Sequence, residues 1–367
     1  MANALGSDES TPEELDGLTY VHGGEPGLGR ERRGGAWVIV DPLGEPVADT
    51  GTLERVRALR IPPAWTDVWI AASPNAHLQA TGHDSKGRRQ YLYHPLWRVR
   101  RDHQKYDDML EFADKLPRIR AATNSLLGTR HGDRDETLAL AIRLLDIGLF
   151  RVGWDRYARD NGHVGLTTLL RENVTLRGPE VHFDFVAKSG KRRRMTVRDP
   201  QSVAALAKLR HRRGTPDELL VFRSDHSWHR IHAADVNNAL RAWGEGPYSA
   251  KEFRTWSATV LAAVALARQH ATGQRGPRAV SRAVHEVSSA LGNTPAVARA
   301  SYIDPRVITL FENDQVIEVP AAQSVASAVE IELDGGGVVL ELPTDVDGDA
   351  VRLEIEQRVH TLLLDAA

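Results

Sequence analysis

The chain has 367 residues, of which 41% are hydrophobic and 26% are charged, a composition typical of soluble globular proteins. It contains no cysteine, which excludes thiolate catalysis, disulfide bonds and cysteine-based zinc sites and is compatible with a reducing cytosol. The length favours about two domains. We expect a cytoplasmic protein, because the chain opens without a signal-peptide pattern and no apolar run approaches the roughly 20 residues of a membrane span.

The formal net charge of −2 conceals an uneven distribution. Residues 1–17 contain five acidic residues and no basic residue. Residues 312–367 contain thirteen acidic residues and two arginines, so residues 18–311 carry a net charge of +14. A basic body is typical of a phosphate-binding protein, which predicts a nucleic-acid partner. The acidic residues 1–17 are interpreted as a disordered, solvated tail.

The segment after this tail, residues 18–96, has the pattern of short β-strands separated by turns. Apolar stretches flanked by glycine or proline occur at 34–44, 68–74 and 88–95. Such stretches are typical of strands that end at tight turns. We therefore expect a mainly antiparallel β domain here.

From Trp97 onward the pattern becomes helical. Residues 97–127 and 135–150 place apolar side chains at three- and four-residue spacing, which indicates amphipathic or buried helices. The charge-rich segment 98–108 is expected to connect the two domains. Helices should then continue to about residue 316, with one interruption.

That interruption lies at residues 181–199. Its first half alternates as a strand, Ser189 and Gly190 form a turn signal, and a second strand follows. The pattern predicts a hairpin within the helical domain, with Lys188 and Lys191 at its tip.

The acidic C-terminal extension, residues 317–367, contains a second hairpin pattern at 329–343 and an amphipathic helix after it. We interpret the extension as a flexible, solvated appendage. The alternative is that it competes with a nucleic acid for the basic groove or docks on a partner.

The residues around one tyrosine suggest that it acts as a nucleophile. Tyr302 follows a helix-start signal at Thr294 and Pro295. A phenol, with a pKa of about 10, can attack a phosphodiester if arginines stabilise the pentavalent transition state and a lysine protonates the leaving oxygen. Candidate partners are Arg151, Arg254 and Lys188. Each type is common by itself, and only the combination points to a DNA-cutting site.

Six stretches carry a family resemblance in the same order along the chain. They cover most of residues 20–316 and lie at 60–70, 79–94, 150–169, 185–193, 249–259 and 291–305. In these stretches the chain resembles the type IB DNA topoisomerases, specifically their bacterial, poxvirus-like branch. The resemblance implies an α+β fold with a β DNA-clamp domain at 18–96 and an α-helical catalytic domain at 97–316 that contains a small hairpin or sheet.

The resemblance also implies roles for the candidate residues. Tyr302 is similar to the nucleophile that forms a 3′-phosphotyrosyl bond, and Arg151 and Arg254 match the arginines that bind the scissile phosphate. Lys188 matches the general acid, with Lys191 as the alternative. Asn293 stands where poxvirus and eukaryotic members have histidine. Its amide can donate a hydrogen bond to a phosphate oxygen but cannot carry a charge.

Further residues are expected to contact DNA. Basic side chains can neutralise phosphates, whereas amide and aromatic side chains can reach bases or sugars. This group comprises Lys86, Arg88, Arg89, Gln90, Tyr91, Tyr157 and Lys251.

The expected reaction needs neither metal nor other cofactor, and no nucleotide-binding loop is complete in the sequence. His226, His229 and His232 are spaced by three, but no carboxylate cluster accompanies them and we expect no metal site there. The expected partner is double-stranded DNA, bound by a monomer, without a membrane and without an obligatory nucleotide.

Two other functions fit parts of the pattern. A tyrosine recombinase would share the catalytic chemistry, but Lys251 and Arg254 form the topoisomerase version of a motif in which recombinases usually have histidine. A DNA-binding clamp without activity would not need all four catalytic residue types.

Overall fold

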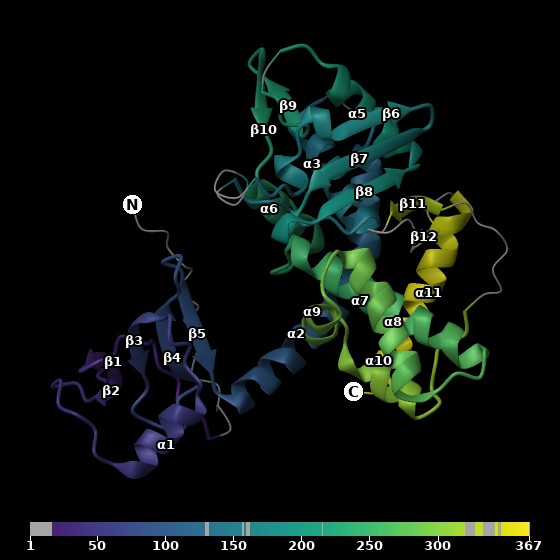
Figure 1. Cartoon of the computed structure of the whole chain (residues 1–367). Helices are drawn as coiled ribbons and strands as arrows, with labels where there is room; N and C mark the ends of the chain where they lie inside the picture. Colours follow the sequence, from purple (N-terminus) through teal and green to yellow (C-terminus); the bar gives the residue numbers. More distant parts are fainter. Residues whose placement is uncertain are drawn as a thin grey trace. The chain divides into compact units, whose positions relative to one another are not determined.

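The computed structural model describes residues 17–366, except 129–131, 156–157, 159–161, 215, 320–326, 333–341 and 344–345. The chain divides into two compact units, one up to Tyr106 and one from Asp107 onward (Figure 1). Helix α2 (Pro95–Leu126) crosses this division. The charged segment 98–108 is therefore part of a helix.

The first unit is built on a five-stranded antiparallel sheet with the strand order β2-β1-β3-β4-β5. Two of these strands, β2 and β5, lie within the stretches that the sequence predicts, and β3 overlaps the third stretch. The strands are β1 (Leu28–Arg33), β2 (Ala36–Val40), β3 (Thr66–Ile70), β4 (Leu78–His83) and β5 (Arg89–Tyr93).

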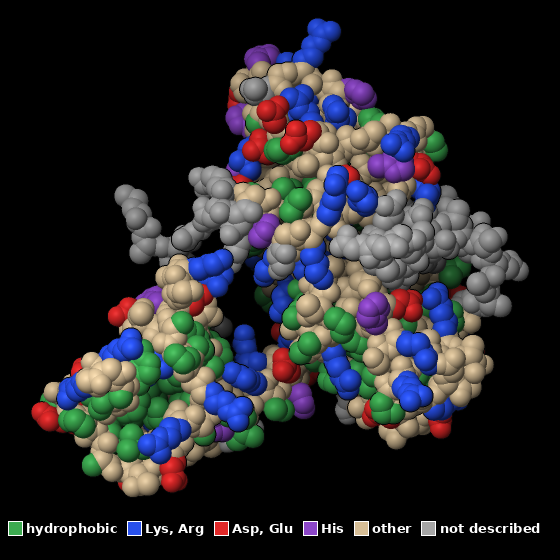
Figure 2. Space-filling view, in the orientation of Figure 1, with side chains coloured by type: hydrophobic (Ala, Val, Ile, Leu, Met, Phe, Trp, Pro, Cys, Tyr) green, Lys and Arg blue, Asp and Glu red, His purple; other side chains and the backbone are tan. Residues whose placement is uncertain are grey.

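A short helix that the sequence analysis did not predict, α1 (Thr50–Ala58), completes the core of this unit. Asp49 caps its N-terminus by accepting a hydrogen bond of 2.7 Å from the backbone N–H of Thr52. Its Val56 packs with the buried Trp65 and Ile70. On the visible face of the unit, hydrophobic side chains lie among lysines and arginines (Figure 2).

The second unit contains a sheet that is larger than the predicted hairpin. The predicted strands are β7 (Glu180–Val186) and β8 (Arg192–Val197), which pair antiparallel around the tip and confirm the hairpin. Three more strands extend it to the order β12-β11-β8-β7-β6. They are β6 (Val174–Arg177), β11 (Ser327–Glu332) and β12 (Leu342–Pro343).

The expectation of a single interruption is wrong. Strands β9 (Val221–Ser224) and β10 (Ser227–Arg230) form a separate hairpin. Its two turn residues, Asp225 and His226, have φ values of 48° and 61°, the conformation that a two-residue hairpin turn requires. Non-glycine residues at both positions obscured this turn in the sequence.

Helices form most of the second unit, in agreement with the predicted α+β class. Besides α2 they are α3 (Arg134–Gly148), α5 (Pro200–His211), α6 (Ala233–Gly244), α7 (Ala250–Ala271), α8 (Gly276–Leu291), α9 (Pro295–Ser301), α10 (Pro305–Glu312) and α11 (Val346–Leu364). Helices α3 and α7 are buried along most of their lengths. Within the described residues, no helix has the length and apolar character needed to cross a membrane.

The interpretation of the C-terminal extension as a solvated appendage is wrong for its described part. Strand β11 pairs with β8 at the edge of the predicted hairpin. On α11 the side chains of Val359 and Leu363 are fully buried. The extension is therefore part of the second unit, and its acidic composition does not keep it in solvent.

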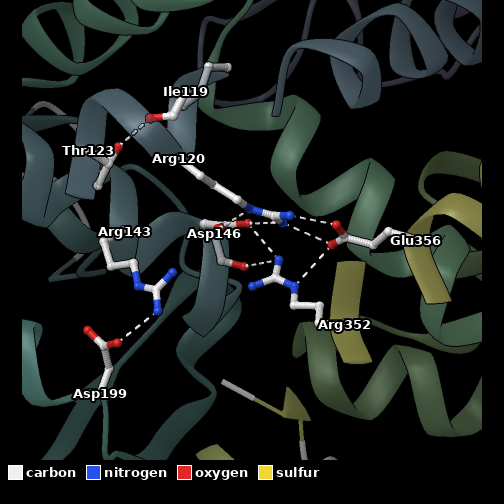
Figure 3. A network of polar contacts seen from close by, with 8 residues as sticks. All are labelled: Ile119, Arg120, Thr123, Arg143, Asp146, Asp199, Arg352 and Glu356. Atoms are coloured by element: carbon white, nitrogen blue, oxygen red, sulfur yellow. Dashed lines mark hydrogen bonds and ion pairs between the residues drawn. The ribbon is translucent and has the colours of Figure 1, made fainter. Parts of the chain in front are cut away.

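A buried network explains how an acidic helix can pack into this unit (Figure 3). Arg120 of α2 contacts both Asp146 of α3 at 2.9 Å and Glu356 of α11 at 2.6 Å. Arg352 contacts the same two carboxylates at 2.6 and 3.0 Å. Although burial alone would raise the pKa of Asp146, the two arginines hold it well below its ordinary value. Two positive and two negative charges thus balance within the network.

Candidate active site

Arg151 reaches the site because α3 ends abruptly before it. The helix is capped by Leu149, which adopts a left-handed conformation with φ 53° and ψ 28°. This conformation is uncommon for a branched residue, and the complete burial of Leu149 holds it in place. The chain then turns so that Arg151, which is half-buried, follows the buried Phe150.

The loop that carries Arg151 is fixed by backbone contacts with a second segment. The carbonyl of Arg151 accepts a hydrogen bond of 2.8 Å from the N–H of Leu166. Gly153 and Gly165 approach so closely that a Cβ on Gly165 would lie 2.4 Å from the Cα of Gly153. Both glycines are therefore required for the close approach that orients Arg151.

Asn293 is positioned by the end of α8. Gly292 caps this helix with φ 63° and ψ 37°, and the N–H of Asn293 donates to the carbonyl of Ser288 at 2.9 Å, as in a Schellman motif. The side-chain oxygen of Asn293 accepts a hydrogen bond from the guanidinium of Arg151. The amide nitrogen of Asn293 is buried, and Asn293 lies close enough to the Tyr302 phenol to help lower its pKa. As a donor, this amide can bind the phenolate or a phosphate oxygen.

Arg254 lies on α7 and is buried, with an exposure of 4%. Its guanidinium donates to the carbonyl of Leu149 and, at 2.9 Å, to that of Leu291. Burial and the charge of Arg151 lower the pKa of Arg254 to about 10. Among the described residues no carboxylate forms an ion pair with either arginine, so both charges are available to an anion.

Tyr302 lies directly beside these arginines. Thr294 caps α9 as the sequence predicts, and Tyr302 ends this helix. The hydroxyl of Thr259 on α7 donates to the carbonyl of Tyr302 at 3.3 Å and accepts from the N–H of Asp304 at 3.1 Å. The guanidinium carbon of Arg254 lies 5.3 Å from the centre of the Tyr302 ring.

The electrostatic environment activates the phenol. Burial alone would raise the pKa of Tyr302, but the positive charges of Arg254 and Arg151 outweigh this effect and bring the pKa below its ordinary value. A lower pKa increases the phenolate fraction at neutral pH. The site therefore has a nucleophile and two cations that can bind the phosphate it would attack.

The hairpin brings its lysines to the same region. A short 3₁₀ turn at Lys188–Gly190 forms the tip. Lys188 is exposed and lines a pocket of about 310 Å³ together with Arg151, Arg254 and Tyr302. Lys191 donates from Nζ to the carbonyl of Asn293 at 3.3 Å. Both candidates for the general acid therefore lie near the site, and Lys188 is the one that faces the pocket.

Further pocket residues come from the loop after Arg151 and from the start of α7. Lys251, predicted as a DNA contact, lines the pocket. The sequence analysis did not identify Trp154 and His163, which also line it. Trp154 is 58% exposed, and the signal available in the sequence was a tryptophan three residues after a predicted catalytic arginine. Tyr157, another predicted contact, lies outside the described residues.

The sequence analysis also missed Arg193, which is buried behind the site. It belongs to a run of basic residues that looks like a solvated surface. The alternation of the strand was the available signal, because Arg193 has the same parity as the apolar Met195 and Val197, and all three are buried.

The predicted DNA contacts of the first unit lie around the β4–β5 turn. Asp84 organises this turn by accepting from the backbone N–H groups of Lys86 and Arg88 at 2.9 and 3.0 Å. A hydrogen bond from Arg88 lowers the pKa of Asp84 to about 2. Gln90 also donates to Asp84, at 3.0 Å. Arg88 and Gln90 are therefore engaged within the turn.

The other residues of this turn present their side chains outward. Lys86 and Arg89 are exposed, and the guanidinium of Arg89 lies 5.5 Å from the ring centre of Tyr91. Tyr91 stacks on Tyr93, with ring centres 6.1 Å apart and exposures of 42% and 37%. An exposed cation beside two exposed aromatic rings is suited to contact a nucleic acid.

The three spaced histidines have separate surroundings. His232 contacts Asp155 at 2.9 Å, His229 stacks on Phe222 across the β9–β10 hairpin, and His226 occupies its turn. In the part of the chain that the structure describes, no group of three or more acidic or histidine side chains is arranged to hold a metal ion.

Comparisons with known proteins identify the family of the chain. The family model of the eukaryotic DNA topoisomerase I catalytic core matches residues 94–313. The model of the bacterial DNA topoisomerase IB N-terminal domain matches residues 36–84. The first match covers more than half of the chain and contains all five residues of the candidate catalytic group, Arg151, Lys188, Arg254, Asn293 and Tyr302.

Viral relatives extend over most of the chain. A DNA topoisomerase 1B of Acanthamoeba polyphaga mimivirus is 27% identical over 300 residues, which are 78% of this chain and 88% of the relative. The DNA topoisomerase I of Monkeypox virus and the DNA topoisomerase 1B of Vaccinia virus (strain Copenhagen) are each 21% identical over 300 residues, covering 79% of this chain and 91% of the relative. The chain thus belongs to the type IB DNA topoisomerases and has the N-terminal domain of their bacterial members.

Proposed function

We propose that this topoisomerase relaxes supercoiled duplex DNA by nicking one strand through Tyr302 and resealing it. The observation that carries the proposal is the position of the Tyr302 ring 5.3 Å from the Arg254 guanidinium, in a pocket that Arg151 also lines. A nucleophile with a lowered pKa and two unpaired cations in one pocket are the parts that phosphodiester attack requires.

The proposed cleavage step is a single displacement at phosphorus. The phenolic oxygen of Tyr302, after losing its proton to solvent, attacks the scissile phosphorus and forms a 3′-phosphotyrosyl bond. The bond between phosphorus and the 5′-oxygen breaks. Arg151 and Arg254 stabilise the extra negative charge on the non-bridging oxygens, and the buried amide nitrogen of Asn293 donates one neutral hydrogen bond.

Lys188 completes this step as the general acid. The departing 5′-oxygen needs a proton, and Lys188 is the hairpin lysine that faces the pocket. Religation is the reverse reaction, in which the 5′-hydroxyl returns its proton to Lys188 and displaces Tyr302. Because the phosphotyrosyl ester conserves the energy of the broken bond, the cycle is proposed to need neither ATP nor a metal ion.

The first unit supplies a proposed grip on the duplex. Lys86 and Arg89 are exposed cations beside the exposed ring of Tyr91, and they are proposed to contact phosphates and sugars. We propose that the enzyme acts as a monomer.

Relaxation of a supercoiled plasmid that has no recombination site tests this function. In a buffer with EDTA and without nucleotide, the protein should convert the plasmid to relaxed topoisomers. A requirement for ATP or Mg²⁺ would contradict the proposed energetics. An inactive protein on this plasmid that becomes active when paired recombination sites are supplied would instead identify a recombinase.

A further inference from the structure

Arg193 is a buried arginine to which the proposed chemistry gives no role. It lies on β8 between Arg192 and Arg194, which are exposed and pair with Asp184 at 2.6 and 3.3 Å. Arg193 itself is 8% exposed, and no carboxylate in the described structure pairs with it. Burying an unpaired charge is unfavourable by several kcal/mol, so its position calls for a compensating contact.

The compensating contacts are carbonyl groups at two helix ends. Arg193 donates from Nη1 to the carbonyl of Ala290 at 2.9 Å and from Nη2 to the carbonyl of Gly148 at 3.4 Å. Ala290 belongs to the last turn of α8, and Gly148 is the last residue of α3. Carbonyls in a last turn lack partners within the helix and form the negative end of its dipole. One guanidinium therefore joins the C-termini of two helices.

Arg254 makes the same connection one residue further along each helix. It donates to the carbonyls of Leu149 and Leu291. Two arginines from different elements, β8 and α7, thus hold α3 and α8 at a fixed separation. The residues that follow these ends are Arg151 and Asn293, which hydrogen-bond to each other.

The position of Arg193 also adds positive charge behind the pocket. Arg193, Arg151 and Arg254 line one small cavity, and burial together with the charges of the other two arginines lowers the pKa of Arg193 to about 9. Strand β8, which carries Arg193, begins just after the hairpin tip, and Lys188 lies in that tip. Strand β8 therefore links the hairpin tip to the ends of α3 and α8, through the hydrogen bonds of Arg193.

We propose that Arg193 is a positioning residue that holds the α3 and α8 ends so that Arg151 and Asn293 meet at the scissile phosphate. The proposal rests on the proposed cleavage function. Loss of the Arg193 fork should let the two helix ends separate and should disturb the transition state more than the bound substrate, because small displacements of catalytic groups affect rates strongly.

The first test compares Arg193→Gln with Arg194→Gln, a matched control on the same strand whose side chain is exposed. Single-turnover cleavage is measured on a duplex that cannot be religated, and DNA affinity is measured at one salt concentration. Arg193→Gln should slow cleavage by about tenfold or more and change affinity by less than about twofold. Arg194→Gln should change neither. Equal cleavage rates in the two variants would overturn the proposal.

A double-mutant cycle separates positioning from general destabilisation. If Arg193 acts through the Arg151–Asn293 contact, Arg193→Gln should slow an Asn293→Ala enzyme by a much smaller factor than it slows the wild type. If the double variant is slowed by the product of the two single-variant factors, the two residues act independently and the proposal is wrong. If Arg193→Gln does not fold, the same cycle with Arg193→Lys, which keeps the charge but loses the fork, gives the decision.

The wild-type reaction distinguishes the two proposals. If the wild type cleaves through a covalent intermediate and Arg193→Gln cleaves equally well, the role of Arg193 is refuted and the function stands. If the wild type forms no covalent intermediate, the proposed function itself fails.

Discussion

Two groups of buried or half-buried arginines lie at the same end of α3, and they differ in what balances their charge. Arg120 and Arg352 contact the carboxylates of Asp146 and Glu356. Arg151, Arg193 and Arg254 form no ion pair with a carboxylate among the described residues; they donate to carbonyl and amide oxygens, and Arg254 also lies against the Tyr302 ring. The first group is electrically balanced within the fold.

The difference indicates which group is structural and which is functional. A balanced network has its counter-ions in place, so its contribution is to packing. An unbalanced group of cations in a pocket stabilises an incoming anion and is a typical feature of a binding or catalytic site. The comparison therefore predicts opposite effects of arginine substitution, on stability in the first group and on catalysis in the second.

The largest effect is expected from Arg352→Ala in the balanced group. It leaves Asp146 and Glu356 with one cation between them, and breaking such a buried network should lower the free energy of unfolding by about 3–5 kcal/mol. Urea denaturation measures this loss. Arg358→Ala, on the same helix with a largely exposed partner in Glu354, is the control and should change stability by less than about 1 kcal/mol.

Arg254→Gln, in the second group, should affect cleavage strongly and stability less. Loss of its charge from the transition state should slow single-turnover cleavage by about 100-fold or more, equivalent to more than about 2 kcal/mol. Its removal relieves repulsion with Arg151 but leaves the buried carbonyls of Leu149 and Leu291 without this donor, so the free energy of unfolding should fall by about 1–2 kcal/mol, less than for Arg352→Ala. Near-normal cleavage, or a stability loss as large as that of Arg352→Ala, would contradict the division into two groups.

The pH dependence of cleavage tests whether the unbalanced arginines lower the pKa of Tyr302. Because Arg254 and Arg151 lower the pKa of Tyr302, the phenolate should form at a lower pH than for an ordinary tyrosine. Removing Arg254 should raise this pKa, so the ratio of wild-type to Arg254→Gln cleavage rates should fall as pH increases toward 10. A ratio that is constant with pH would show that Arg254 does not affect ionisation of the nucleophile.

The smallest effects are expected at the β4–β5 turn, where the same contrast recurs at the surface. Arg89 has no acidic partner in the described structure, whereas Arg88 pairs with Asp84 at 2.7 Å. Arg89→Ala should reduce the slope of log affinity against log salt by about 0.9, the change for one phosphate contact. Arg88→Ala should reduce it less. Equal slopes for the two variants would refute the assignment of Arg89 as the phosphate contact.

The sequence was most informative where local pattern decides structure. The apolar run before Arg151 predicted α3, the Thr294–Pro295 pair predicted the start of α9, and the turn at Ser189 and Gly190 predicted the β7–β8 hairpin. These elements carry most of the candidate site. Local signals therefore located the candidate residues, although not the contacts among them.

The sequence predicted a hairpin and a helix in the C-terminal extension, but it did not predict the contacts of these elements with segments distant in the chain. Strand β11 gains its place by pairing with β8, more than a hundred residues earlier. The acidic α11 is buried because Arg120, 236 residues before Glu356, provides a counter-charge. Arg193 was overlooked because its contacts, Gly148 and Ala290, belong to two other elements. Composition alone suggested solvent for all three.

The most direct test of the account is to identify the residue that becomes covalently attached to DNA. The protein is mixed with plasmid and denatured, the adduct is digested, and the DNA-linked peptide is sequenced. The account predicts a peptide carrying DNA on Tyr302, linked to a 3′-phosphate, and no adduct from a Tyr302→Phe variant that still binds DNA. An adduct at another residue, or one that persists in Tyr302→Phe, would contradict it.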